Sequence, residues 1–127
     1  MSITQENPRK LYKDYSRRIE VLSSDAEDDG LVLNEASERD FWHYIRSVPF
    51  AQKAGLVLVD NGDLRAVWKG DDESHLGIQF LGNQWVEYVI FKHRPSTSDV
   101  ARVAGRDTLD GIKRQIDAFD LTSLMGT

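Results

Sequence analysis

Glu87 is the residue whose chemistry stands out first, because it is the one charged side chain on the predicted core face of a sheet. Its expected neighbours there are apolar: Ile78, Trp85 and Val89. Desolvation by such neighbours raises the pKa of a carboxyl group, and the group can then serve as a general acid or base. The alternative is that Glu87 turns outward, or that Arg102 or Arg106 pairs with it.

The other residues that could act in catalysis or ligand binding do not form a recognisable motif. The chain has no cysteine, so disulfides, thiolate zinc sites and thiol nucleophiles are excluded. His43, His75 and His93 form neither an HExxH motif nor a closely spaced pair, so we expect no metal. No glycine-rich phosphate loop and no GxSxG motif is present, so we expect no cofactor. The sequence gives catalysis no positive support.

Length and composition indicate one small globular protein. The chain has 127 residues, of which 40% are hydrophobic and 29% charged. A chain of this size can bury a hydrophobic core without disulfides or a structural metal. The start, MSITQENPRK, has no apolar signal-like segment, and we expect a cytoplasmic protein without a membrane span. The net charge of −5 disfavours broad non-specific binding to nucleic acid.

Residues 1–30 predict a helix followed by an acidic linker that is free to move relative to a single α+β domain at 31–127. After Pro8, apolar residues recur at intervals of three and four, at Leu11, Tyr15, Ile19 and Leu22. Residues 23–40 then carry seven acidic side chains and one basic one. Four of the acidic residues could steer a basic protein partner, mainly through the association rate: Asp25, Glu27, Asp28 and Asp29.

A second helix is predicted before Pro49, with Asn34 or Ser37 as its N-cap. Near the other end of the chain, Val100–Ala104 predicts a short strand, and a C-terminal helix is expected from Asp107. The basic residues of this region are interleaved with five aspartates, so a nucleic-acid partner is not expected. Those basic residues are Arg94, Arg102, Arg106, Lys113 and Arg114.

Two dipeptides mark tight turns between segments of alternating polarity. Asn61-Gly62 and Gly82-Asn83 are each typical of a two-residue hairpin turn, and a longer loop, 70–74, lies between them. The sequence therefore predicts an antiparallel meander of four to five strands over about residues 56–104. With the helices, this is an α+β fold.

Turn lengths fix which side chains reach the core, because opposed residues of an antiparallel pair share a face. A five-residue middle loop places Trp68 opposite Leu76, and the last turn places Phe80 opposite Trp85. The predicted core face then contains Val57, Val59, Leu64, Ala66, Trp68, Leu76, Ile78, Phe80, Trp85, Glu87, Val89 and Phe91.

The second face of this predicted sheet is unusually apolar. Such a face is either covered by the chain's own N-terminal helix or presented to a partner. Apolar and aromatic anchors within a polar rim are what protein-binding hot spots use. The candidate partner-binding residues are Arg65, Val67, Lys69, His75, Val86, Tyr88 and Ile90.

The stretch Asn34–Leu121 resembles a pattern found in small uncharacterised bacterial proteins. The residues that carry the resemblance are Phe41-Trp42, Ser47-Val48-Pro49, Asn61-Gly62, Trp68-Lys69-Gly70 and the segment 76–91. It resembles accessory proteins of antitoxin, immunity or defence type, which implies a neutralising or scaffolding role. It implies no catalytic residue.

We therefore expect a non-catalytic module that binds a protein partner through the second sheet face. The alternative is a small enzyme or ligand-binding domain with a pocket around Glu87, Trp68 and Trp85. A homodimer through the same face or an edge strand is a third expectation.

Overall fold

The computed structural model describes residues 8–70, 73–93 and 100–126, and residues 1–7 of the predicted N-terminal segment lie outside this description. The helices and strands follow one another in the order helix, helix, five strands, helix. Their bounds are α1 Pro8–Asp28, α2 Glu35–Ser47, β1 Gly55–Leu58, β2 Leu64–Lys69, β3 His75–Phe80, β4 Trp85–His93, β5 Val100–Thr108, α3 Ile112–Ala118 and a final 3₁₀ turn η1 Thr122–Met125.

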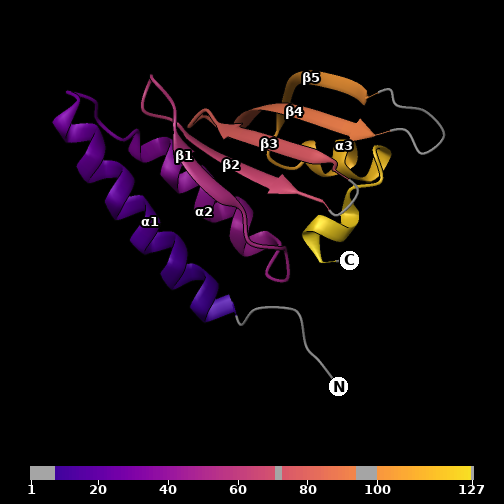
Figure 1. Cartoon of the computed structure of the whole chain (residues 1–127), viewed down its shortest axis with the longest axis horizontal. Coiled ribbons are helices and arrows are strands. Elements are labelled where there is room, and N and C mark those ends of the chain that lie inside the picture. The colour runs from indigo at the N-terminus through magenta and orange to yellow at the C-terminus, as the bar shows by residue number, and fades with distance from the viewer. Residues whose placement is uncertain (1–7, 71–72, 94–99, 127) are drawn as a thin grey trace.

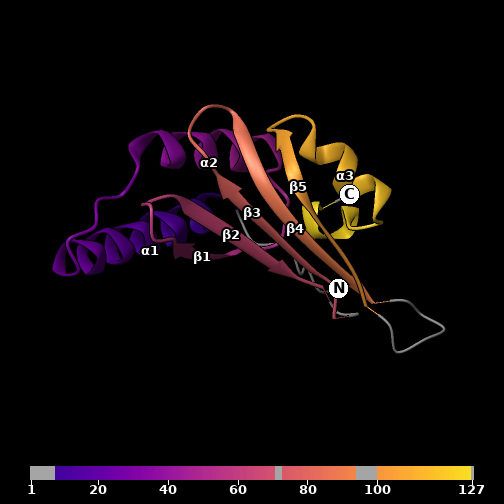
Figure 2. The same cartoon turned by 90° about the horizontal axis from the view of Figure 1, so that it is seen from above.

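The predicted α+β class and antiparallel meander are confirmed. The strands form one five-stranded sheet in the order β1-β2-β3-β4-β5, each paired with its sequence neighbour (Figure 1). Helices α2 and α3 lie on the same side of this sheet, and α1 lies beside α2 and β1 (Figure 2). The sheet is therefore packed on one face.

Helix α1 is longer than expected and belongs to the core. It continues to Asp28, so most of the segment predicted as an acidic linker is helical, and that prediction is wrong. The buried Tyr15 ring lies edge-on to Phe41 at 5.2 Å, and its hydroxyl accepts a hydrogen bond from the Ala54 backbone at 2.8 Å. Residues 8–28 thus pack into the same core as the rest of the chain.

Helix α2 begins at Glu35, and Asn34, one of the two predicted caps, is its N-cap. The Asn34 side chain accepts a hydrogen bond from the Ala36 amide at 3.1 Å. Ser37, the rival cap, is fully buried instead: its hydroxyl donates to the Phe80 carbonyl at 2.5 Å and accepts from the Leu64 amide at 2.8 Å. Ser37 therefore ties α2 to β2 and β3.

The turn between β1 and β2 is one residue longer than predicted. Val59 donates to the Asp63 carbonyl at 2.9 Å, which leaves three turn residues, with Gly62 at a φ of 90°. Leu56 consequently lies opposite Ala66 and is buried, whereas Val57 is 42% exposed. The predicted placement of Val57 on the core face is wrong.

The turn between β3 and β4 differs in the same way. Leu81 donates to the Trp85 carbonyl at 3.1 Å around a three-residue turn, because the Gln84 amide is drawn to a carboxylate oxygen of Asp40 at 2.7 Å. Phe80 therefore lies opposite Val86 instead of Trp85. Every side chain of β4 changes face relative to the prediction. The register between β2 and β3, with Trp68 opposite Leu76, is as predicted.

The fifth strand extends beyond its predicted end. It runs from Val100 to Thr108, and the C-terminal helix begins at Ile112, not at Asp107. Asp107 instead accepts a hydrogen bond from the Thr108 amide at 2.8 Å. The longer strand brings Arg106 into the sheet opposite Glu87.

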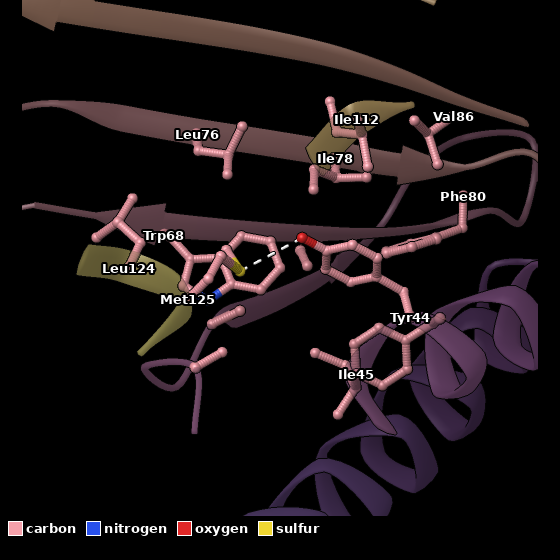
Figure 3. Close-up of a cluster of buried hydrophobic side chains, with 14 of the residues drawn as sticks. Tyr44, Ile45, Trp68, Leu76, Ile78, Phe80, Val86, Ile112, Leu124 and Met125 are labelled. Atoms are coloured by element: carbon pink, nitrogen blue, oxygen red, sulfur yellow. Dashed lines mark hydrogen bonds between the residues drawn. The ribbon is translucent and has the colours of Figure 1, made fainter. Parts of the chain in front are cut away.

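The core lies between the sheet and the helices (Figure 3). Tyr44 of α2 points between Trp68 and Phe80, and its hydroxyl donates to the Met125 sulfur at 3.3 Å. Burial raises the pKa of Tyr44 well above its usual range. Ile112 of α3 closes the same layer over β3 and β4.

Candidate functional site: the outer face of the sheet

The face of the sheet opposite the helices is the candidate site, and we call it the outer face. The alternation of side chains along each strand determines its membership. Its described residues are Gly55, Val57, Arg65, Val67, Lys69, His75, Gly77, Gln79, Trp85, Glu87, Val89, Phe91, Arg102, Ala104, Arg106 and Thr108.

Four of the seven predicted partner-binding residues lie on this face: Arg65, Val67, Lys69 and His75. The other three, Val86, Tyr88 and Ile90, are on the core face, where they are 0%, 9% and 0% exposed. A partner cannot reach these three side chains, so the prediction is wrong for them. The cause is the longer turn between β3 and β4, which turns β4 over.

The same change brings Trp85, Glu87, Val89 and Phe91 to the outer face. Trp85 is 45% exposed, and the Glu87 side chain is 43% exposed. The predicted apolar surroundings of Glu87 are therefore wrong, and the carboxylate instead pairs with Arg106 at 2.8 Å. That pairing was the stated alternative.

The predicted pocket around Glu87, Trp68 and Trp85 is wrong as well. Trp68 is 1% exposed on the core face, where its indole N–H donates to the Gln52 carbonyl at 2.8 Å. Glu87 and Trp85 lie on the other side of the sheet. The three side chains cannot line one cavity.

Arg65 is held in place by a chain of hydrogen bonds. Its guanidinium donates to the Gln79 side-chain oxygen at 3.1 Å, and the Gln79 amide donates to Asp63 at 3.1 Å. Asp63 is 4% exposed and also accepts from the side chains of Asn34 and Asn61 at 2.8 and 3.1 Å. The cation is thus oriented by buried groups.

Phe91 organises the opposite part of the outer face. The Arg102 guanidinium carbon lies 5.7 Å from the centre of the Phe91 ring, a cation–π arrangement. On the other side, His75 meets the same ring edge-on at 6.2 Å. The partly exposed ring therefore lies between two basic side chains.

A hollow of about 550 Å³ lies between these groups. Its floor is Gly77, where an added Cβ would meet no atom within 4 Å, and three arginines surround it: Arg65, Arg102 and Arg106. Of the described residues that line it, Glu87 alone is acidic. The hollow is thus cationic although the whole chain carries a net charge of −5.

The acidic residues expected to steer a partner are not on the outer face. Asp25, Glu27 and Asp28 occupy the last turns of α1, and Asp29 follows directly. The first half of α1 is basic, and with α2 it forms a groove that contains Lys10, Lys13, Arg17 and Arg46. None of the described residues that line this groove is acidic.

The described residues, 8–70, 73–93 and 100–126, contain no group of three or more histidine, aspartate and glutamate side chains placed to hold a metal ion. None of their helices combines the length and apolar character needed to cross a membrane.

Comparison with known proteins returns nothing. No protein-family model, curated protein or solved structure matches this chain. The function must be argued from the surfaces described above.

Two arginines of β5 are candidate binding residues that the sequence analysis did not include among the partner-binding residues. The sequence places Arg102 and Arg106 in a basic group interleaved with aspartates, and the structure brings both to the outer face beside Phe91 and Glu87. Their even spacing with Ala104 is the available signal, because alternate residues of a strand share a face. Arg94 of the same basic group lies outside the described residues.

Proposed function

We propose that this protein is a non-catalytic module that binds a protein partner through the outer face of its sheet. The observation that carries the proposal is a sheet face with exposed aromatic and aliphatic side chains that no described helix covers. A neutralising or scaffolding role, of the kind that accessory proteins of bacterial defence loci have, is consistent with such a module.

The apolar content of the outer face supports binding. Trp85 is 45% exposed, and Val57 is 42% exposed. An antiparallel sheet can face water on one side, but that side is then usually polar. Tryptophan and arginine dominate the energetics of protein interfaces, and both are present here. The outer face therefore has the composition of a hot-spot patch.

The charge of the outer face indicates an acidic partner. Arg65, Arg102 and Arg106 surround the hollow, and Lys69 lies further along β2. Arg65 is oriented by its hydrogen bond to Gln79, so little side-chain entropy is lost when it meets a carboxylate. A basic partner was expected to be steered by Asp25, Glu27, Asp28 and Asp29. The outer face is itself cationic and would repel such a partner, so we propose an acidic partner instead.

The test is quantitative capture from a lysate of the native host. The bait variant Trp85→Ser/Arg102→Glu removes one apolar anchor and reverses one charge on the outer face. The matched control, Phe50→Ser/Arg114→Glu, makes the same kinds of change away from it, since Phe50 is 53% exposed and Arg114 is an exposed residue of α3. Each capture is performed at low and at high salt.

The proposal predicts a stoichiometric acidic protein that binds the wild type and the control at low salt but not the outer-face variant. Equal capture by all three baits would overturn it, and so would the absence of a captured protein. Recovery of single-stranded nucleic acid instead of a protein would also overturn it, because aromatic rings and arginines can bind stacked bases and phosphates.

A ligand-binding function is the second candidate, and the hollow above Gly77 favours it. Three arginines around about 550 Å³ would suit a small polyanion. Isothermal titration with inorganic pyrophosphate distinguishes this candidate. Saturable binding that Arg65→Ala abolishes supports the ligand, and no heat of binding excludes this class of probe.

A further inference from the structure

We propose that α1 is a self-recognition surface, on which a second copy of this chain binds antiparallel to the first. The proposal concerns the exposed side of α1 and is independent of the outer face. It starts from the distribution of charge along one helix.

Helix α1 has a basic half and an acidic half. Residues 8–18 carry five basic side chains, Arg9, Lys10, Lys13, Arg17 and Arg18, and one acidic side chain, Asp14. Residues 19–28 carry no basic side chain and four acidic ones, Glu20, Asp25, Glu27 and Asp28. Such a helix is complementary to an antiparallel copy of itself.

This arrangement opposes the helix's own dipole. Acidic side chains stabilise the first turn of a helix and basic ones the last turn, yet α1 has no acidic residue in its first turn and no basic residue in its last. The charges therefore destabilise the isolated helix. An opposing helix with the reverse order of charges would offset this cost.

The charged residues lie on the side of α1 that faces away from the core. Leu11, Tyr15, Ile19 and Ala26 are buried on one side, and the opposite side presents residues at helical spacing. The exposed stripe consists of Lys10, Lys13, Arg17, Glu20, Val21, Ser24, Glu27 and Asp28. Val21, at its middle, is 48% exposed and gives the stripe an apolar centre.

A two-fold axis between residues 19 and 20 pairs this stripe with itself, because antiparallel helices match residues at equal distances from the axis. Position 10 then lies opposite position 29 and position 13 opposite position 26. Lys10 and Lys13 therefore each lie within one residue, about 1.5 Å along the helix, of direct opposition to Asp28 and Glu27 of the second copy. Arg17 lies beside Glu20 and Val21 of the second copy. Each contact occurs twice.

The groove between α1 and α2 extends the complementarity. Lys10, Lys13 and Arg17 line it from α1, and Arg46 lines it from α2 with its guanidinium carbon 5.3 Å from the centre of the Trp42 ring. The acidic end of the second copy's α1 would lie along this groove. Among the residues that the structure describes at this groove, none carries a carboxylate that would compete for these cations.

A charge-swap experiment on the full chain tests the proposal. Lys10→Glu/Lys13→Glu makes the basic end of the stripe acidic, and Glu27→Lys/Asp28→Lys makes its acidic end basic. All four side chains are exposed, so circular dichroism should report folded protein for both variants. Sedimentation equilibrium then measures the molecular mass of each variant and of an equimolar mixture.

The proposal predicts that the wild type dimerises at low salt, that each variant alone is monomeric, and that the mixture forms a heterodimer. The dissociation constant of the wild type should rise by at least about tenfold between about 0.01 M and about 1 M salt, over which the Debye length falls from about 30 Å to about 3 Å. Lys113→Glu/Arg114→Glu on α3 changes the net charge as the first variant does, and it should dimerise like the wild type.

A wild type that stays monomeric at low salt would overturn the proposal. Dimers that persist in both swapped variants, or a mixture that remains monomeric, would do the same. The outer-face variant Trp85→Ser/Arg102→Glu should dimerise like the wild type. Failure of the partner-capture experiment therefore leaves this result unaffected.

Discussion

Arg106 and Glu87 lie directly opposite each other on β5 and β4, and Arg106 donates two hydrogen bonds to the same carboxylate oxygen, from Nε at 3.1 Å and from Nη2 at 2.8 Å. The pair lies on the outer face, with side chains 67% and 43% exposed. The pair follows the register of β4 and β5, in which Glu87 is a surface residue.

Glu87→Gln should change stability little. An exposed ion pair contributes at most about 1 kcal/mol, because water screens it and both side chains lose entropy. Urea unfolding of the wild type and the variant checks this value. A loss of stability several times larger would mean that Glu87 is buried in solution, as the two-residue turn required.

Ser37→Ala should destabilise the protein strongly, although the substitution changes the volume of the side chain only a little. The Ser37 hydroxyl is fully buried and bonds both the Phe80 carbonyl and the Leu64 amide, and alanine would leave these two backbone groups unpaired. The expected loss is about 3 kcal/mol in the free energy of unfolding. Ser47→Ala, at an exposed serine that donates to the Tyr44 carbonyl at 2.6 Å, is the control and should cost less than about 1 kcal/mol.

The raised pKa of the Tyr44 phenol should make the free energy of unfolding fall at alkaline pH. Burial raises the pKa of its phenol in the folded state, so above the unfolded pKa of about 10 the unfolded chain releases a proton that the folded chain keeps. Stability is complete below that pH and falls as the pH rises, by at most about 1.4 kcal/mol per pH unit from this one group.

Tyr44→Phe should remove this part of the alkaline slope, although it also deletes the hydrogen bond to the Met125 sulfur. Urea unfolding at several pH values from neutral to alkaline measures the slope for each protein. Identical slopes for the wild type and Tyr44→Phe would contradict the account.

The sequence predicted the elements better than it predicted the faces. The α+β class, the meander and the register between β2 and β3 followed from polarity alternation and a five-residue loop. The other two registers depended on turns that contain Asn-Gly and Gly-Asn, which favour two residues in isolation. In the fold, tertiary hydrogen bonds to Asp63 and from Gln84 to Asp40 stabilise three-residue turns instead.

One residue in each turn was enough to change the candidate site. Because side chains alternate along a strand, the shift exchanged Val86, Tyr88 and Ile90 for Trp85, Val89 and Phe91 on the outer face. Long-range partners such as Asp40 cannot be recognised from local sequence. The sheet does have a second face that no described helix covers, but three of the residues predicted to lie on it are buried in the core.

Gly77→Val tests the central claim most directly, because it places an apolar side chain in the hollow of the outer face. Gly77 lies between Val67 and Val89 on the outer face, and an added Cβ meets no atom within 4 Å. Valine also suits a strand better than glycine, so the free energy of unfolding should stay the same or increase.

The measurement is the affinity of Gly77→Val for the protein captured by the wild type, determined by calorimetry alongside an unfolding curve. The account predicts an affinity at least about tenfold weaker, the cost of about 1.4 kcal/mol in lost complementarity, with no loss of stability. Unchanged affinity in a stable variant would contradict the claim that the partner binds at this face.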